Sequence, residues 1–434
     1  MRKNMKLMKV PRMMGMLALL ALCTVPVFAG GEKQGSSGAG QTRTIRWMTT
    51  RANQPAWDLV VKQYEREHPD VKVEFERISD STSYYQKLKI LAAGGELPDM
   101  FDSEGDALLA EIAATGVLKD IDELYQELNY DRMVNIGKNY TRLPNGKLYD
   151  LAWENNIEYF WYHKDLFAKA GIAKTPETFD EFLEVCQKLK AAGIAPIAVA
   201  GSTSWTTLRW LSFIPFRLTG NKYIEDLKAG KARMSDPVGI QTAEFFQKLG
   251  KDYFQPGWAS CDYTSALEVF LSGNAAIYNI GSWQFGSFLG PDREPKDDYG
   301  FFYIPTLKGA VNGKTDMVAH AGTGTSIRKD KCDEQFKDFI KYFLNAYPET
   351  YFKEMKAFPA MTFDTTSAVF SKFDQQVMDD CNALTSFAYT WDVRLDTATN
   401  EVMSKELVNL GMGVITPQEF ARRIDAAIAK NAAR

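Results

Sequence analysis

The chain has 434 residues, of which 45% are hydrophobic and 24% are charged, and its formal net charge is −4. This composition is ordinary for a globular protein, and the length allows two to three domains with a sizeable core. The acidic balance argues against a nucleic-acid-binding protein, which needs a basic surface to displace the counterions of the phosphates.

Residues 1–29 have the parts of a secretory signal peptide. Five basic residues open the segment, an apolar run occupies residues 13–25, and Val27-Phe28-Ala29 supplies a cleavage signal. The apolar run is shorter than the roughly 20 residues of a membrane-spanning helix. We therefore expect cleavage after Ala29 and a soluble protein in the periplasm or outside the cell. Without the leader the chain has 46 basic and 55 acidic residues, a net charge of about −9.

Cys23 leaves a second route of export open. Bacterial lipoproteins are cut just before a cysteine that follows a Leu-small-small pattern, but Leu22 is bulky at a position where Gly, Ala or Ser is usual. Ordinary cleavage is therefore favoured, and the alternative is a lipid on Cys23 as the chain's only membrane attachment. Residues 30–42 are rich in Gly and Ser, which predicts a flexible linker.

The first part of the mature chain alternates between strand and helix patterns. Strands are predicted at residues 44–48, 71–75 and 97–101, and helices at residues 55–68 and 84–94. Arg51 and Asn53 stand where the first strand gives way to the first helix. Asp102 and Glu104 follow the third strand. Ligands of open α/β sheets bind at such carboxyl ends of strands, so these four residues are candidate ligand contacts. For the two acidic residues the alternative is that they cap the next helix.

Residues 145–199 form the unit around which the rest of the chain is organised. The polar cluster at residues 153–156 interrupts an extended pattern just before an aromatic run of strand length at residues 157–162. We interpret the cluster as a crossing between two lobes. Glu154 and Asn156 are therefore candidate ligand contacts, because both lobes can reach a ligand at a crossing.

A helix with clear ends follows this strand. Thr178 and Glu181 form a capping box at its start, and Gly193 can end it in a left-handed conformation. Residues 194–199 then predict a buried strand, which completes a strand-helix-strand unit. Cys186 lies on the apolar helix face and is interpreted as a buried thiol. The four cysteines of the mature chain allow three full pairings and also allow none.

Three short patterns in the chain can be compared with known families. They are Leu97-Pro98-Asp99-Met100-Phe101, the run Trp161-Tyr162-His163-Lys164-Asp165-Leu166-Phe167 with Thr175-Pro176-Glu177-Thr178-Phe179-Asp180-Glu181-Phe182, and the set Phe270, Gly273, Ala275, Ala276, Gly281 and Trp283. Together they resemble the extracellular solute-binding proteins of sugar-uptake ABC transporters, the class that includes maltose-binding protein. His163 departs from the usual Asn at a turn position that accepts several polar residues. The resemblance covers residues 43–434.

The resemblance implies an α/β fold of the two-lobe periplasmic-binding-protein type (type II), with the lobes joined by three hinge crossings. The crossings are expected near residues 153–156, 298–302 and 356–360. Lobe 1 would comprise residues 43–153 and 303–356, and lobe 2 residues 154–302 and 357–434. Residues 299–305 would be an extended return toward the first lobe.

Tryptophans are candidates for ligand contacts because aromatic faces pack on the apolar faces of sugar rings. We expect either Trp205 or Trp210 in the site, although a large aromatic side chain more often belongs to a core. Trp283 is the best single candidate, because a short strand at residues 275–280 and a glycine turn present it. Its alternative role is to plug the sheet edge. Trp391 lies in the late helical part that closes over the cleft in relatives.

Two further candidates come from the resemblance alone. Residues 320–327 resemble a family segment in which glycines bring the backbone close to the ligand, so His320 and Gly322 join the candidate site.

The implied function is to bind a mono- or oligosaccharide in the cleft between the lobes and to deliver it to the transmembrane subunits of an ABC importer. The ligand would bridge both lobes, and its higher affinity for the closed form would drive hinge closure. We expect a monomer with no cofactor, no metal and no nucleic-acid partner. Which sugar binds does not follow from scaffold motifs.

Two alternative functions remain. A sugar receptor for a sensor or chemotaxis system would have the same binding fold. A secreted carbohydrate-active enzyme would need two carboxyl groups about 5–9 Å apart. A chain with 55 acidic residues does not exclude this by count, but it has no GxSxG, HExxH or P-loop pattern. Its three histidines also lack the spacing of a zinc site, so we expect no enzyme.

Overall fold

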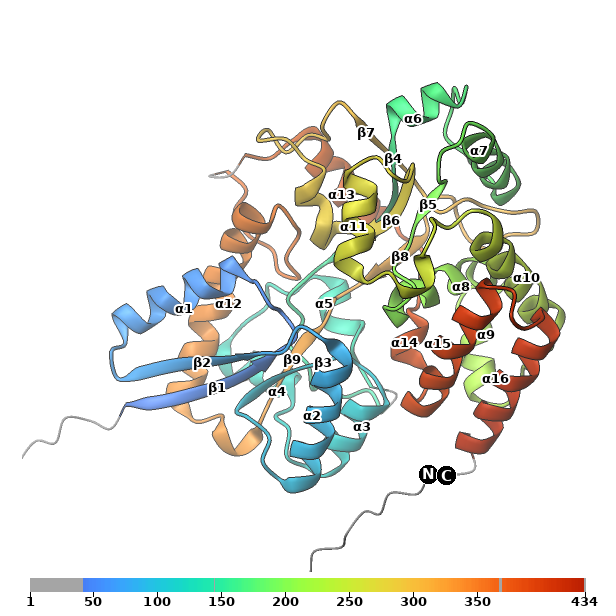
Figure 1. Ribbon diagram of the computed structural model, residues 1–434. Coiled ribbons are helices and arrows are strands. Elements are labelled where there is room, and N and C mark those ends of the chain that lie inside the picture. Colours follow the sequence, from blue (N-terminus) through green and yellow to red (C-terminus); the bar gives the residue numbers. More distant parts are fainter. Residues whose placement is uncertain (1–41, 144, 367–368, 433–434) are drawn as a thin grey trace, which may run out of the picture. The chain divides into compact units, whose positions relative to one another are not determined.

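The computed structural model describes residues 42–143, 145–366 and 369–432, which contain two β-sheets with helices packed around them (Figure 1). The expected signal peptide, Cys23 and the expected linker up to Gln41 lie outside the described residues. In the described part, no helix is both long and apolar enough to cross a membrane. The same part contains no group of three or more His, Cys, Asp or Glu side chains arranged to hold a metal ion.

The first sheet contains the strands predicted at the start of the chain. They are β1 (Arg43–Thr49), β2 (Val71–Arg77), β3 (Met100–Ser103) and β9 (Gly324–Ile327), in the order β2-β1-β3-β9. β1 pairs in parallel with β2 and β3, and β9 runs antiparallel to β3. Side chains of β1 alternate between the two faces, so Ile45 and Trp47 enter one core while Met48 enters the other.

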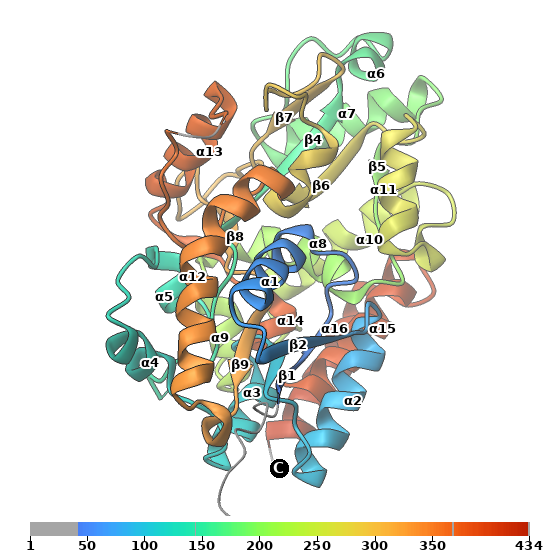
Figure 2. The same ribbon diagram turned by 90° about the vertical axis from the view of Figure 1, so that its left-hand side faces the viewer.

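Helices cover both faces of this sheet. They are α1 (Pro55–Glu67), α2 (Ser81–Gly94), α3 (Ala107–Ala114), α4 (Ile121–Leu128), α5 (Asn135–Asn139) and α12 (Glu334–Met355). α1 and α12 lie side by side over one face, and α2 and α3 cover the other (Figures 1 and 2). Trp57 of α1 stacks on Trp47 of β1 with ring centroids 4.0 Å apart. α2 begins before the predicted residue 84, because Asp80 caps it by accepting from Ser83 N at 2.8 Å.

The second sheet is built on the predicted aromatic strand, which is β4 (Asn156–His163). Its other strands are β5 (Ile197–Ala198), β6 (Ile277–Gly281), β7 (Tyr299–Phe302), β8 (Met317–His320) and β10 (Phe387–Ala388). The order is β10-β8-β4-β6-β5, and β7 also pairs with β4. β4 is antiparallel to β6, β7 and β8. The strand predicted at residues 194–199 is present only as the two residues of β5.

Helices of the second half pack around this sheet and continue to the end of the described chain. They are α6 (Lys164–Lys169), α7 (Phe179–Ala191), α8 (Ser204–Thr219), α9 (Lys222–Lys228), α10 (Pro237–Asp252), α11 (Tyr263–Leu271), α13 (Lys372–Ala383), α14 (Trp391–Arg394), α15 (Thr397–Gly411) and α16 (Pro417–Ala432), with the short 3-10 helices η1 (Trp258–Ser260), η2 (Ser282–Ser287) and η3 (Lys329–Lys331). The predicted capping box of Thr178 and Glu181 is present at the start of α7, and Gly193 has a φ of 74°. Cys186 is buried, and the four described cysteines are free thiols.

Within the described residues, three segments connect the two sheets, and backbone pairing holds them to one another. In the first crossing, Trp153 O accepts from Ala360 N at 2.9 Å and Asn155 N donates to Phe358 O at 2.9 Å, so the first and third crossings are hydrogen-bonded together. The second crossing, at residues 321–323, joins β8 to β9. Strand β8 also pairs with the start of β4, which ties the second crossing to the first.

The second crossing lies later in the chain than the expected residues 298–302. Those residues contribute to β7, which pairs with β4. Residues 303–320, assigned above to lobe 1, also stay with the second sheet, since Ile304 and Val318 lie in its core. The chain therefore returns to the first sheet only after His320. The sequence of an extended aromatic run does not determine which strand it pairs with. Here the run forms β7 and pairs with the edge of β4 opposite β6.

Candidate ligand-binding site

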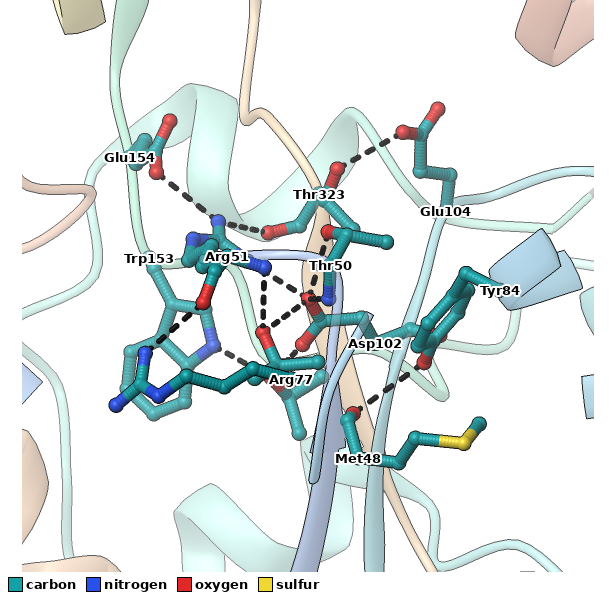
Figure 3. A network of polar contacts seen from close by, with 12 residues as sticks. Met48, Thr50, Arg51, Arg77, Tyr84, Asp102, Glu104, Trp153, Glu154 and Thr323 are labelled. Carbon is teal, nitrogen blue, oxygen red and sulfur yellow. Dashed lines mark hydrogen bonds and ion pairs between the residues drawn. The ribbon is translucent and has the colours of Figure 1, made fainter. Parts of the chain in front are cut away.

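Arg51 is the centre of a polar network where the first sheet meets the crossings (Figure 3). Its guanidinium donates to Asp102 Oδ2 at 3.2 Å, to Glu154 Oε1 at 2.9 Å and to the backbone oxygen of Thr323. Asp102 belongs to β3, Glu154 to the first crossing and Thr323 to the second. One cation thus joins three separate segments, and the candidates Arg51, Asp102 and Glu154 are in direct contact.

The charges of this network compensate one another. Asp102 is fully buried and also accepts from Thr49 Oγ1 at 2.7 Å and Thr50 N at 2.9 Å. Burial raises the pKa of Asp102, and the Arg51 charge and these hydrogen bonds oppose the rise. For Arg51, burial alone would lower the pKa, but Glu154 and Asp102 outweigh it and raise the pKa above its ordinary value. Arg51 therefore remains a fixed cation.

Gly322 makes room for Glu154. Its φ is 67°, and an added Cβ would lie 2.7 Å from Glu154 Oε2 and 3.1 Å from Asn156 Nδ2. Asn156 donates to Glu154 Oε2 at 2.8 Å and accepts from Ser282 Oγ at 3.0 Å. A residue without a side chain is required here on both conformational and steric grounds.

We predict that Gly322→Ala lowers the free energy of unfolding by about 1–2 kcal/mol, because a side chain is strained at this φ. It should also weaken ligand binding, because the new methyl group displaces Glu154. Gly95→Ala is the matched control: Gly95 has a φ of 69° with no atom within 4 Å of an added Cβ, so it carries the strain without the clash. Denaturant and ligand titrations measure both effects. Equal ligand affinity in the two variants would show that Gly322 does not position Glu154.

Trp283 lies in an aromatic group beside the crossings. At the preceding Gly281, an added Cβ would lie 1.9 Å from the Trp283 ring, so the ring folds back over this glycine. The Trp283 ring centroid is 5.9 Å from that of Trp205 and 5.2 Å from that of His320. Its indole donates to Tyr263 Oη at 3.1 Å. Both tryptophans are partly exposed.

A second charged network, which the sequence patterns did not predict, lies on the second sheet. Glu158 of β4 is buried, its Oε1 accepts from Arg209 Nε at 2.7 Å, and Arg209 Nη1 donates to Asp392 Oδ1 at 3.2 Å. His320 Nε2 lies 3.3 Å from the same Glu158 oxygen. Burial would raise the pKa of Glu158, but Arg209 and His320 outweigh it and keep the pKa below its ordinary value. The available signal was a carboxylate inside an otherwise apolar strand, where a lone charge is costly.

Glu104 is hydrogen-bonded to a residue of the first network. It accepts from Thr323 Oγ1 at 2.9 Å. Burial, followed by the carboxylates of Asp392 and Asp106, raises the pKa of Glu104 to about 7. Asp106 caps α3 by accepting from Leu109 N at 2.8 Å. The capping role considered for Asp102 and Glu104 therefore belongs to Asp106.

Two of the remaining candidates are packed in the core, and the third is exposed. Trp210 is 2% exposed and packs in the core of the second sheet, with its ring 5.3 Å from that of Phe160. Trp391 is 3% exposed and lies beside Tyr223. Asn53 is exposed. Of the pair Trp205 and Trp210, Trp205 is therefore the one whose ring is partly exposed, and Arg209 of the second network lies over it.

Comparisons with known proteins place this geometry in a family. Residues 49–347 match the family of bacterial extracellular solute-binding proteins. An ABC transporter extracellular-binding protein of Pyrococcus horikoshii is 25% identical over 292 residues, which is 64% of this chain and 64% of that protein. A multiple sugar-binding protein of Streptococcus mutans is 24% identical over 347 residues, which is 78% of this chain and 80% of that protein.

Solved structures have the same fold. A chitin oligosaccharide binding protein aligns with a TM-score of 0.80 at 22% identity, covering 91% of this chain and 100% of that one. This likeness confirms the predicted α/β fold of two lobes joined by crossings. The family match spans more than half of the sequence and includes every residue of the two charged networks except Asp392. The chain belongs to the bacterial extracellular solute-binding protein family.

Proposed function

We propose that this protein binds a carbohydrate between its two lobes and delivers it to the transmembrane subunits of an ABC importer. One observation carries the proposal: the Asn156 amide of the first crossing contacts Ser282, and the Glu158 carboxylate of the second sheet contacts His320, which packs against the partly exposed Trp283. Such groups bind sugar hydroxyls, and an indole packs on the apolar face of a sugar ring. Two relatives support it, since one is named a multiple sugar-binding protein and the other an ABC transporter extracellular-binding protein.

The proposed site keeps nine of the candidate residues and adds three. The kept residues are Arg51, Asp102, Glu104, Glu154, Asn156, Trp205, Trp283, His320 and Gly322. The added residues are Glu158, Arg209 and Asp392, which form an ion-paired group in contact with Trp205 and His320. Trp210 and Trp391 are left out because they are packed in the core, and Asn53 because it is exposed outside both networks.

Binding is proposed to work by hinge closure at the three crossings. One lobe would consist of residues 43–153 and 321–356, and the other of residues 154–320 and 357–434. A ligand that touches Arg51 in one lobe and Trp283 in the other has a higher affinity for the closed form and shifts the population toward it. The permease would then recognise the closed form.

The remaining parts of the proposal concern location, partners and chemistry. We propose an exported monomer that needs no cofactor and meets the membrane only through its permease, or through a lipid on Cys23 if that residue is modified. A receptor that hands the sugar to a sensor is the alternative partner. The relatives named above are binding proteins, which favours binding without catalysis.

A thermal-shift screen of the mature protein against mono- and oligosaccharides tests the proposal. A ligand at 100 times its Kd should add about 2.7 kcal/mol of stability. Trp283→Ala should abolish the shift. Phe245→Ala is the matched control, because Phe245 is also a partly buried ring packed against the same core, and it should retain the shift. If no sugar stabilises the wild type, the proposal is wrong.

The fate of the sugar separates binding from catalysis. After overnight incubation with the protein, the stabilising sugar should be recovered unchanged. A shortened or hydrolysed product that disappears when one site carboxylate is neutralised would instead establish the carbohydrate-active enzyme.

A further inference from the structure

The proposed site contains a hydrogen-bond acceptor that no protein group fills. Glu158 is 1% exposed, and its Oε2 has no hydrogen-bond partner among the described residues, whereas Oε1 accepts from Arg209. A buried carboxylate oxygen without a partner costs free energy. Glu158 Oε2 is therefore placed for a donor that the ligand brings.

This oxygen belongs to the proposed site through its neighbours. His320 lies 3.3 Å from Glu158 Oε1 and packs against Trp283 with ring centroids 5.2 Å apart. Arg209, which binds the same carboxylate, lies over the ring of Trp205 at 5.5 Å from its centroid. Each of the two side chains next to the Glu158 carboxylate thus packs against a partly exposed indole on which a sugar ring would stack.

The carboxylates of the site outnumber its cations. The ion pairs are Arg51 with Asp102 and with Glu154, and Arg209 with Glu158 and with Asp392. Each guanidinium therefore already faces two carboxylates. Glu104 forms no ion pair within residues 42–143, 145–366 and 369–432, and the hydrogen bond found there comes from the uncharged hydroxyl of Thr323. The site as a whole carries an excess of negative charge.

Two of the carboxylates that make up this excess, Glu104 and Asp392, come from different elements. Glu104 follows β3 of the first sheet, and Asp392 lies in α14. Gly105, which follows Glu104, packs against the backbone of Thr141, and the neighbouring Tyr140 Oη lies 2.6 Å from Thr390 Oγ1, two residues before Asp392. The raised pKa of Glu104, caused first by burial and then by Asp392, agrees with this proximity. Two like charges partly removed from water are unfavourable unless a proton or a cation compensates them.

We infer that the carbohydrate carries a protonated amine, which lies between Glu104 and Asp392 while a hydroxyl donates to Glu158 Oε2. The ligand class is an amino sugar, free or within an oligosaccharide. An ammonium group brings one positive charge and three donors to a place that lacks both. A neutral sugar would satisfy the acceptors and leave the charge unpaired. The inference rests on the proposed function, because it specifies the sugar that the same site takes.

Isothermal titration with disaccharides that differ only at carbon 2 tests the inference. Three β-1,4-linked ligands serve: the glucosamine disaccharide with free amines, cellobiose with hydroxyls, and the N-acetylglucosamine disaccharide. Glucosamine and galactosamine are compared with glucose and galactose in the same way. At neutral pH we expect the best amine ligand to bind about tenfold or more tightly than its neutral counterparts, as for hydrogen bonds to charged groups.

Isosteric variants locate the amine. Glu104→Gln and Asp392→Asn should each reduce the preference for the amine ligand about tenfold, with a much smaller effect on the neutral ligands. Glu184→Gln, an exposed carboxylate on α7, is the control and should leave the preference unchanged. A wild-type preference that survives both site variants would place the amine elsewhere and overturn the inference.

The outcomes separate the inference from the proposed function. Equal affinity for amine and neutral sugars, or a preference for the neutral ones, overturns the inference and leaves carbohydrate binding intact. Failure of every carbohydrate in the wider screen overturns the proposed function, and the inference with it.

Discussion

Arg51→Met is expected to lower the free energy of unfolding by about 3–5 kcal/mol, because removing one partner of a buried ion pair leaves the other charges uncompensated. The side chains of Asp102 and Glu154 are 0% and 10% exposed, and both face this guanidinium. Methionine keeps an apolar stem for packing against Trp57, over which Arg51 lies at 4.9 Å. The decrease in the free energy of unfolding is therefore due mainly to the missing charge. Urea unfolding followed by tryptophan fluorescence measures it.

The same substitution is expected to abolish ligand binding, because Glu154 and Asp102 lose the cation that orients them. Arg293→Met is the matched control. Arg293 donates to the two Asp374 oxygens at 2.6 and 2.7 Å, and these side chains are 5% and 0% exposed, outside the proposed site. Arg293→Met should lower the free energy of unfolding by a similar amount, while the folded variant keeps its ligand affinity. A stability loss below about 1 kcal/mol for Arg51→Met, as for an exposed pair, would contradict the prediction.

Part of the site could be predicted because its signals are local. Arg51 and Asp102 stand near the ends of β1 and β3, which pair in parallel with each other, and parallel strands bring their carboxyl ends to one edge of a sheet. The structure places the two side chains 3.2 Å apart. The capping box at Thr178 is local in the same sense. Whether any of these residues contacts a ligand stays a prediction.

Other parts depend on tertiary packing and have no local signal. Trp205 and Trp210 are five positions apart on α8, which turns their side chains about 140° away from each other. The sequence does not indicate which of the two side chains faces the core. Arg209 and Asp392 are separated by 183 positions and meet only after α8 and α14 have packed on the same sheet. The pairing of β7 with β4 likewise follows from which strand edge is free when the sheet forms.

The stability of the protein is expected to fall by up to about 3 kcal/mol through Glu104 as the pH rises from about 4.5 to about 7. Burial, then Asp392 and Asp106, raises the pKa of Glu104 from 4.5 to about 7 in the folded protein. Between these values the folded protein holds a proton that the unfolded chain has released. The stabilisation is therefore complete below the unfolded pKa and is lost as the pH rises through the folded pKa. The titratable groups whose charges interact electrostatically with Glu104 are Tyr85, Asp106, Tyr140, Asp150, Arg209 and Asp392.

Urea unfolding of the wild type and of Glu104→Gln at pH steps between about 4 and 8 isolates this contribution, because the other groups titrate in both proteins and cancel in the difference. As the pH rises, the free energy of unfolding of the glutamine variant should increase relative to that of the wild type, since glutamine has no charge to be desolvated. Asp392→Asn should move the pH range in which stability is lost to lower pH, because it removes the largest repulsion on Glu104. A difference that is constant with pH would contradict the raised pKa. A saturating amino sugar should also move this pH range to lower pH, because a bound ammonium favours the charged carboxylate. A neutral sugar leaves that charge unpaired and should have no such effect.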